Sequence, residues 1–265
     1  MKSKQISRLS FAAGTLVLHG WSPEGVRQVF GAEPWQWDAR VGAWRCDAIH
    51  YSAVRERLQS RAVGFEDTVP EWKPVRWQKT ELHTLRPDQQ AGLDAWRRAQ
   101  RGVIVMPTGT GKTEIALTIM AETAVSTLVV APVLDLMYQW HRRILHGLGY
   151  DAGIIGDNVF NVRPVSVTTY DSACIHMEKL GARFGLLIFD ECHHLPGDVR
   201  RDATRMSAAP WRLGLTATPT RSDGRHVDLD WLIGPRVYEL PIAAARGKTL
   251  AEYEVVRIPV HLSDA

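Results

Sequence analysis

The chain contains the sequence Val103-Ile-Val-Met-Pro-Thr-Gly-Thr-Gly-Lys-Thr113, from which a strand, a loop and the start of a helix can be predicted in succession. The apolar residues Val103 to Val105 are typical of a buried strand, and Glu114 to Leu117 continue beyond the glycines as a helix. A glycine-rich loop between a strand and a helix is the setting in which backbone N–H groups surround a phosphate. The stretch therefore predicts a phosphate-binding loop.

Each residue type in this loop suits phosphate chemistry. Gly109 and Gly111 allow the backbone at Thr110 to curl so that its N–H groups face one anion. Lys112 supplies a positive charge for the β- and γ-phosphates, and the Thr113 hydroxyl is placed to ligate Mg²⁺. We therefore expect ATP and Mg²⁺ as cofactors. The alternative, a glycine-rich turn that contains a lysine by chance, leaves the flanking strand and helix unexplained.

A second motif, Leu186-Leu-Ile-Phe-Asp190-Glu191, is an apolar strand that ends in two adjacent acids. We expect Asp190 to hold Mg²⁺ through a water, together with Thr113, while Glu191 orients the water that attacks the γ-phosphate. Lys112, Asp190 and Glu191 are thus the predicted catalytic residues. The alternative is an acidic loop after a core strand, which the phosphate loop upstream makes the weaker hypothesis.

The residues after these acids suggest a link to the next strand. We interpret His193 as a coupling residue that reaches the loop Thr216-Ala-Thr218, whose two hydroxyls suit a sensor of the acids. A zinc site around Cys192 is disfavoured because a closed structural site needs four ligands, and the other two cysteines offer no matching pair.

Composition sets wide limits on function. The 265 residues are 45% hydrophobic and 23% charged, as in soluble globular proteins, and the net charge of +3 is compatible with nucleic acid without arguing for it. Three scattered cysteines suggest no disulfide framework and fit a reducing compartment. No apolar run is long enough to span a bilayer, so we expect no membrane association and a cytoplasmic location, with the nucleoid in a prokaryote. We interpret Phe11 to Leu18 as a first strand rather than a secretion signal, and Thr15 to His19 as the residues best suited to it.

Strand and helix patterns alternate beyond the loop. Strands are predicted at 127–131, 165–169, 186–189 and 213–216; the first is a continuous apolar run, and apolar residues at helical spacing follow it. This alternation predicts an α/β fold with a doubly wound parallel sheet that binds its ligand at the carboxyl ends of the strands. We divide the chain into a small α+β domain at 1–71, a linker at 72–84, the α/β domain at 85–250, and the start of a further connection at 251–265.

The small domain is predicted from shorter signals. Residues 35–38 and 43–46 are expected to form a hairpin, and Ser52 is expected to cap a helix in which Tyr51, Val54 and Leu58 recur at helical spacing. Ten tryptophans are many for this length; they suit anchors between domains, with stacking on bases as the alternative.

Taken together, the motifs resemble the first motor domain of superfamily 2 helicases. The resemblance rests on six segments in the expected order: Leu85-Arg-Pro-Asp-Gln89, Pro107 to Thr113, Val130-Ala-Pro132, Thr168 to Ala173, Asp190 to His193, and Thr216-Ala-Thr218. It is strongest to the short prokaryotic members of the XPB family of DNA repair helicases, because of Asp190 to Pro196, Gly214 to Thr218, and Asp223-Gly-Arg-His226. It runs from about residue 85 to 259, and more weakly over the N-terminal domain, which is similar to the family's damage-recognition domain.

The resemblance implies a RecA-like fold and the activity of an ATP-dependent DNA helicase or translocase. It also implies that Arg86 and Gln89 recognise adenine, and that Pro132 and Thr169 lie in segments that touch the nucleic-acid backbone. The XPB family has an Arg-Glu-Asp triplet linked to unwinding. Here the matching residues are Arg221-Ser-Asp223, so Arg221 and Asp223 are candidate DNA residues although the central acid is absent.

Superfamily 2 helicases bind ATP between two motor domains, and the second domain supplies arginines. Because the motifs of a second domain do not follow before Ala265, we interpret the chain as the N-terminal half, either a fragment or a short protein that needs a partner. We expect it to bind ATP–Mg²⁺ and DNA with weak turnover by itself. The resemblance implies as partners DNA, the second motor domain of the same protein, and a nuclease or repair protein.

Two other hypotheses remain open. The chain could be a non-catalytic module that binds nucleic acid or a partner and uses ATP as a structural ligand. It could also belong to another superfamily 2 ATPase, such as a restriction-enzyme motor subunit or an RNA helicase.

Overall fold

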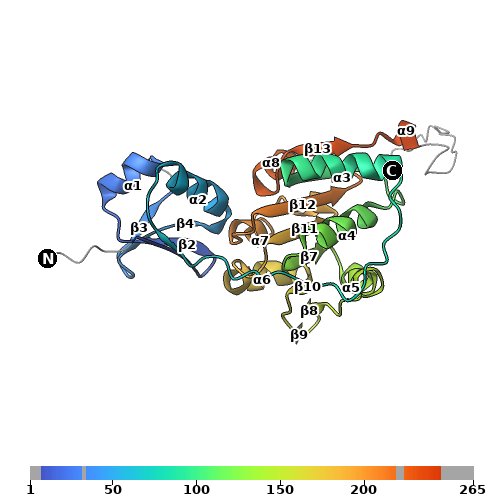
Figure 1. The fold of residues 1–265 in the computed structure, drawn as a ribbon, viewed down its shortest axis with the longest axis horizontal. Coiled ribbons are helices and arrows are strands. Elements are labelled where there is room, and N and C mark those ends of the chain that lie inside the picture. The colour runs from blue at the N-terminus through green and yellow to red at the C-terminus, as the bar shows by residue number, and fades with distance from the viewer. Residues whose placement is uncertain (1–6, 32–33, 219–223, 246–265) are drawn as a thin grey trace, which may run out of the picture.

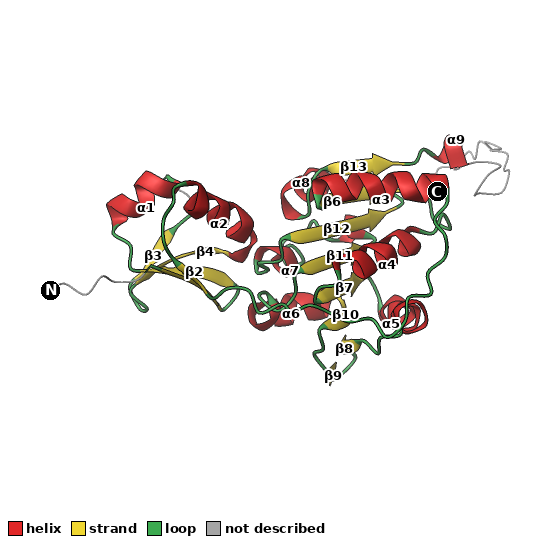
Figure 2. Cartoon of the chain, in the orientation of Figure 1, coloured by secondary structure: helices red, strands yellow, loops and turns green. Residues whose placement is uncertain are grey.

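Two β-sheets, built from successive parts of the chain, organise the protein (Figures 1 and 2). The computed structural model describes residues 7–31, 34–218 and 224–245. A five-stranded sheet comes from residues 8–67, and an eight-stranded sheet comes from residues 101–239. The parallel strands of the larger sheet are covered by helices on both faces, so the predicted α/β fold class is confirmed.

The smaller sheet carries two helices on one side (Figure 2). Its strands lie in the order β3-β4-β2-β1-β5, and they are β1 (Arg8–Ala12), β2 (Thr15–His19), β3 (Gln36–Asp38), β4 (Ala43–Asp47) and β5 (Glu66–Asp67). The helices are α1 (Pro23–Phe30) and α2 (Tyr51–Ser60). Leu9, Leu16, Leu18, Val54 and Leu58 form the buried core between sheet and helices. The predicted hairpin is confirmed, since β3 and β4 pair antiparallel with Trp37 opposite Trp44.

Two local predictions in this part are wrong. Thr15–His19 does form a strand, β2, but Phe11 to Leu18 is not one strand, because the chain turns at Ala13 and Gly14, which have φ values of +50° and +73°, and pairs β1 with β2. The glycine at position 14 was the signal for that turn. Ser52 does not cap α2; a short 3-10 helix at 48–50 leads directly into Tyr51, with His50 at the cap position.

Helix α1 was not predicted, although its start follows the usual rules. Ser22 accepts a hydrogen bond from the backbone N–H of Gly25, and Pro23 stands at the first helical position. The sequence Ser-Pro-Glu was therefore a usable signal for a helix start.

The larger sheet places the phosphate loop beside the acidic motif. Its order is β13-β6-β12-β11-β7-β10-β8-β9, and all neighbours are parallel except β8 and β9. The strands are β6 (Arg101–Val105), β7 (Thr127–Ala131), β8 (Gly153–Gly156), β9 (Val159–Phe160), β10 (Val165–Thr169), β11 (Leu186–Asp190), β12 (Trp211–Thr216) and β13 (Arg236–Glu239). Only β12 separates β6 from β11, so the loop after β6 and the acids after β11 meet at one edge.

Helices close both faces of this sheet. They are α3 (Pro87–Ala99), α4 (Lys112–Thr123), α5 (Leu134–Leu148), α6 (Tyr170–Leu180), α7 (Asp202–Arg205), α8 (Leu229–Leu232) and α9 (Ile242–Ala245). One apolar cluster packs α3, α4 and α5 on the sheet, and a second packs α6, α7 and α8 on the opposite face. Among the described residues, no helix has the length and apolar composition needed to cross a membrane.

The two parts of the chain touch through specific contacts. Arg205 donates from both Nε and Nη2 to Asp47 Oδ2, at 2.9 and 2.8 Å, and the N–H of Gly14 donates to the carbonyl of Glu178 at 3.1 Å. Trp72 lies edge-on to Tyr51 and packs against the cores of both parts, which fits the anchoring hypothesis for this tryptophan. The domain boundaries at residues 71 and 84 stay predictions.

Candidate nucleotide-binding site

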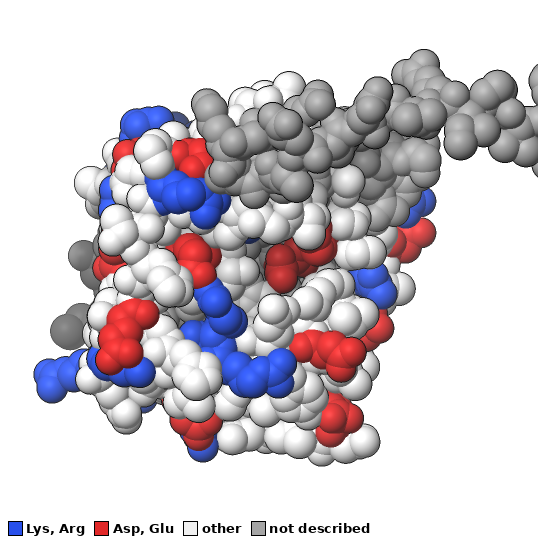
Figure 3. Space-filling model, turned by 90° about the vertical axis from the view of Figure 1, so that its right-hand side faces the viewer, with Lys and Arg blue, Asp and Glu red and all other residues white. Residues whose placement is uncertain are grey.

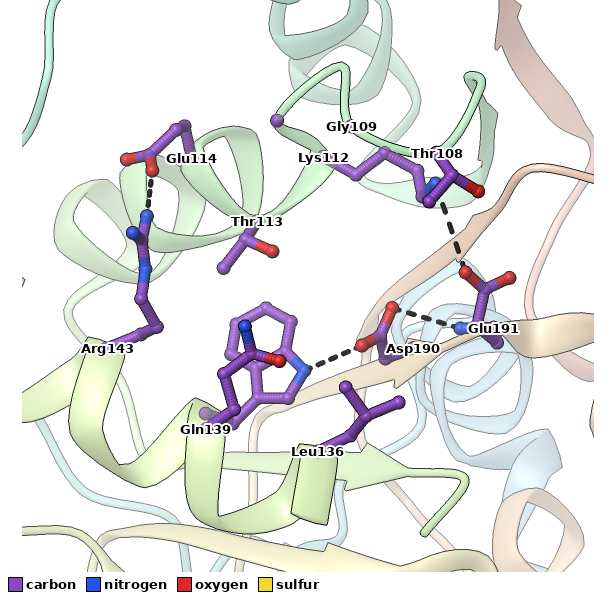
Figure 4. A pocket seen from close by; sticks show the side chains of 12 residues that line it. Thr108, Gly109, Lys112, Thr113, Glu114, Leu136, Gln139, Arg143, Asp190 and Glu191 are labelled. Carbon is purple, nitrogen blue, oxygen red and sulfur yellow. Dashed lines mark hydrogen bonds and ion pairs between the residues drawn. The ribbon is translucent and has the colours of Figure 1, made fainter.

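A cleft of about 360 Å³ lies at the carboxyl ends of β6 and β11 (Figure 4). The arrowheads of β12 and β13 point to the right in Figure 2, and Figure 3 looks onto that side of the molecule, where acidic side chains lie in a hollow of the surface. The cleft is lined by Thr108, Gly109, Gly111, Lys112, Thr113, Glu114, Leu136, Gln139, Trp140, Arg143, Asp190 and Glu191. The predicted phosphate loop and acidic motif therefore share one cavity.

The loop depends on two glycines in left-handed conformation. Gly109 and Gly111 have φ values of +80° and +76°, which are costly for residues with a Cβ atom. A Cβ on Gly111 would lie 2.4 Å from Nε2 of Gln89, whereas a Cβ on Gly109 would meet no atom within 4 Å. Gly111 ends the loop as the N-cap residue of α4, so the free N–H groups of that helix point toward the cleft.

Arg86 and Gln89 hold the loop from behind. Gln89 is 2% exposed, and its Nε2 donates to the carbonyls of Thr110 at 3.0 Å and Gly111 at 3.3 Å. Its Oε1 accepts from the backbone N–H of Arg86 at 2.9 Å, and the Arg86 guanidinium donates to the Thr110 carbonyl. Neither residue is among those that line the cleft. Adenine recognition by this pair stays a prediction; in this structure their polar atoms bind the loop.

Lys112 lies between the loop and the acids. Its side chain is almost buried, and Nζ donates to the carbonyl of Met106 at 3.0 Å and lies 4.0 Å from Oε1 of Glu191. Burial lowers the pKa of Lys112, and the charges of Glu191 and Asp190 oppose that shift. A buried ammonium group at this position can form charge-assisted hydrogen bonds to the oxygens of a polyphosphate.

Asp190 is fixed by three donors at the end of β11. Trp140 Nε1 donates to Oδ2 at 2.8 Å, the backbone N–H of Glu191 donates to Oδ1 at 3.1 Å, and the Tyr170 hydroxyl donates to the backbone carbonyl at 3.0 Å. Burial raises the pKa of Asp190. Figure 4 shows the carboxylate and the Thr113 hydroxyl on the same cavity.

The predicted coupling residues are brought together. His193 Nδ1 lies 3.4 Å from Glu191 Oε2, 2.9 Å from Thr216 Oγ1 and 3.4 Å from Thr218 Oγ1. Since the Thr216 hydroxyl donates to the Thr218 carbonyl at 3.1 Å, it accepts from His193, which assigns the proton to Nδ1. Glu191 itself has a φ of +47°, a strained conformation for a residue with a side chain. The structure thus connects the acid to the loop after β12.

The donor set fits Mg²⁺ bound with a nucleotide. In the part of the chain that the structure describes, no group of three or more His, Cys, Asp or Glu residues could hold a metal ion. Mg²⁺ does not need such a group, because it usually takes one or two carboxylates and completes its shell with phosphates and waters. Thr113 and Asp190 offer the hard oxygen ligands for that mode of binding.

Of the residues predicted to contact DNA, two are described. Pro132 directly follows β7, and Thr169 ends β10 and caps α6 by accepting from the N–H of Ser172. β7 and β10 are neighbours, so both residues lie at the same edge of the sheet as the cleft. Arg221 and Asp223 lie outside the described residues, as does the segment 251–265.

Helix α5 contributes cleft residues that the sequence did not reveal. Gln139, Trp140 and Arg143 come from one side of this helix, and Arg143 pairs with Glu114 of α4 (Figure 4). The helical spacing identified Trp140 only as an apolar residue. Its hydrogen bond to Asp190 joins residues fifty positions apart, and a local sequence pattern cannot predict such a contact.

Fold and cleft together define the class of this protein: a P-loop nucleotide-binding protein with a RecA-like domain. A family model described as "Type III restriction enzyme, res subunit" matches residues 82–221, and one described as "Xeroderma pigmentosum group B helicase damage recognition domain" matches residues 9–69. The first match covers more than half of the chain, which therefore belongs to that family, and the second match makes its N-terminal part similar to a domain of XPB helicases.

Individual relatives agree with this assignment. The chain is 39% identical over 229 residues to the DNA 3'-5' translocase XPB2 of Sulfurisphaera tokodaii, covering 86% of this chain and 52% of that protein. It is 33% identical over 193 residues to the DNA 3'-5' helicase XPB of Kineococcus radiotolerans, covering 68% and 34%. The UvsW helicase of bacteriophage T4 shares the fold, with a TM-score of 0.53 at 12% identity over 88% of this chain and 99% of that one. The chain thus spans about half the length of the first relative.

Proposed function

We propose that this chain is the ATP-binding half of an ATP-dependent DNA helicase or translocase of the XPB repair type. The observation that carries the proposal is the meeting of Lys112 and Glu191, 4.0 Å apart, between the phosphate loop and the acidic strand end. The alternative of a module that never hydrolyses ATP gives no role to Glu191, whose left-handed backbone is costly to maintain. The names of the relatives support DNA as the substrate.

The cleft residues divide the chemistry among them. Bound ATP–Mg²⁺ supplies the phosphoanhydride to be cleaved and a cation to neutralise charge on its phosphates. The N–H groups of the loop and of the first turn of α4 bind phosphate oxygens, and Lys112 exchanges its bond to the Met106 carbonyl for them. Thr113 and Asp190 would hold the Mg²⁺. Glu191 orients a water and accepts its proton.

The contacts that run from Glu191 through His193 to Thr216 and Thr218 link this chemistry to movement. Glu191 changes its surroundings when a water and a γ-phosphate enter the cleft. His193 shares its Nδ1 proton between that acid and the Thr216 hydroxyl, so a shift at the acid alters the loop after β12. We propose this relay as the coupling of nucleotide state to DNA movement, with Pro132 and Thr169 on the DNA track.

We further propose that a second motor domain completes the site. Among the described residues that line the cleft, the two cations are Lys112 and Arg143, and the latter is engaged by Glu114. Arginines from a second domain would stabilise the charge that develops on the γ-phosphate, a contribution that is worth ~10³ or more in rate. A repair nuclease remains a proposed partner by family resemblance, and the cytoplasm a proposed location.

The test is ATP hydrolysis by this chain with no nucleic acid, with duplex DNA, and with RNA, and then with a separately produced second motor domain of an XPB relative. We expect turnover to be negligible for the chain alone and to rise with DNA, not RNA, once the second domain is added. Glu191→Gln should abolish that rise and keep nucleotide binding. Strong DNA-stimulated turnover by the chain alone would contradict the need for a second domain, and stimulation by RNA alone would contradict the substrate.

A further inference from the structure

Trp140 contributes one polar atom to an otherwise apolar packing position. The side chain is 2% exposed and belongs to the core cluster between α5 and the large sheet. Trp44, Trp77 and Trp96 donate their indole N–H groups to backbone carbonyls, which is a structural use of this group. The indole of Trp140 instead donates to a carboxylate of the cleft, at 2.8 Å from Oδ2 of Asp190; Trp231 also donates to a carboxylate, that of Asp228 at 3.2 Å, but this pair is exposed and does not line the cleft.

This bond restricts how Asp190 can present its oxygens. Oδ1 accepts from the N–H of Glu191 and Oδ2 accepts from Trp140, so rotation of the carboxylate would break one bond or both. Each carboxylate oxygen has two acceptor positions, and each therefore keeps one for a further partner. The indole has a donor and no acceptor, so it competes for no cation. The remaining positions are held in the cavity that Thr113 also lines.

We propose that Trp140 is a positioning residue for the metal: its indole N–H holds the Asp190 carboxylate in the orientation that receives the Mg²⁺ of the bound nucleotide. The proposal rests on the proposed function, since it assumes that the cleft binds ATP with Mg²⁺. It assigns to α5 a part in the site that the phosphate loop and the acidic motif do not account for. Hydrogen-bond partners that orient metal ligands typically contribute 10- to 100-fold to metal affinity.

Trp140→Phe removes the N–H and keeps an aromatic ring in the apolar cluster. We expect it to lower the affinity for Mg²⁺ about tenfold or more, which raises the Mg²⁺ concentration at half-saturation of nucleotide binding by the same factor. Affinity for the nucleotide in EDTA should stay unchanged, because Lys112 and the loop have no contact with the indole nitrogen. The measurement is a Mg²⁺ titration of the binding of a non-hydrolysable fluorescent ATP analogue, so it does not depend on turnover.

Trp96→Phe is the matched control. Trp96 is buried to 3% exposure, and its indole donates to the Arg212 carbonyl at 2.9 Å, away from the cleft. It should show the wild-type Mg²⁺ dependence although it loses an equivalent hydrogen bond. An unchanged Mg²⁺ half-saturation in Trp140→Phe, or an equal loss of affinity with and without Mg²⁺, would overturn the proposal.

Two further variants keep the test decisive. If Trp140→Phe does not fold, replacing Trp140 with 3-benzothienylalanine preserves the fused ring and exchanges only the N–H for sulfur. In an Asp190→Asn background, the Trp140 substitution should cause no additional change in Mg²⁺ dependence, and an additive change would contradict the mechanism. If wild type fails to bind the analogue at all, the proposed function fails; if wild type binds with Mg²⁺ and Trp140→Phe matches it, only this inference fails.

Discussion

The two glycines of the phosphate loop allow backbone strain to be separated from side-chain contact. Gly109 and Gly111 have nearly equal positive φ values, +80° and +76°, so Gly→Ala should cost about 1 kcal/mol of backbone strain at either position. A Cβ at Gly109 enters open space, whereas a Cβ at Gly111 would lie 2.4 Å from Gln89 Nε2 and would displace that amide. The displaced amide loses its bonds to the Thr110 and Gly111 carbonyls, which costs about 2 kcal/mol for a buried group.

We therefore expect Gly109→Ala to lower the free energy of unfolding by about 1 kcal/mol and Gly111→Ala to lower it by about 3 kcal/mol. Urea denaturation measures both values. In a Gln89→Ala background no amide remains to be displaced, and the two glycine substitutions should then cost the same. Equal costs in the wild-type background, or an excess at Gly111 that survives Gln89→Ala, would refute the argument that Gln89 supports the loop through this close contact.

Three further predictions follow from buried and interfacial charges. Arg212 is fully buried and donates to the carbonyls of Ala209, Leu232 and Ser207, so Arg212→Lys should lower the free energy of unfolding by about 3 kcal/mol; a loss under 1 kcal/mol would contradict this role. The raised pKa of Asp190 means that the folded state keeps its proton more tightly than the unfolded state. Stability should therefore fall as pH rises from about 3.8 through the raised pKa, and Asp190→Asn should lack this part of the slope in urea titrations across pH. The side chains of the Arg205–Asp47 pair are about one-third exposed, so Asp47→Ala should lower the free energy of unfolding by about 1 kcal/mol or less in thermal unfolding. A larger loss would mean that the pair is shielded from water in solution, against this account.

Features encoded by neighbouring residues could be predicted from the sequence. Strand β7 begins and ends where the predicted apolar run does, because a central parallel strand is buried on both faces, and β10 has the predicted bounds although it alternates valine with hydroxyl residues. The phosphate loop could be predicted for the same reason, since its strand, glycines and helix are consecutive. Gly149 ends α5 in left-handed conformation, the usual position of glycine at a helix end.

Contacts between distant segments could not be predicted in this way. The bond from Trp140 to Asp190 depends on how α5 packs against β7 and β10 beside the end of β11, which is a property of the assembled sheet. The hydrogen bond from Gln89 to the Thr110 carbonyl of the loop likewise depends on how α3 packs against α4. Strand β13 escaped detection because Arg236–Glu239 is a short edge strand with a charged, exposed residue at each end, which leaves too few apolar residues for a pattern.

The most direct test of the central claim is the affinity of this chain for ATP–Mg²⁺, measured by calorimetry for wild type, Lys112→Ala and Lys179→Ala. Lys112 lies in the cleft, and Lys179 lies exposed on α6. We predict that wild type and Lys179→Ala bind equally and that Lys112→Ala binds about a hundredfold more weakly, because it loses charge-assisted bonds to the phosphates. Equal affinity of all three proteins would contradict the account, since ATP would then bind somewhere other than this cleft.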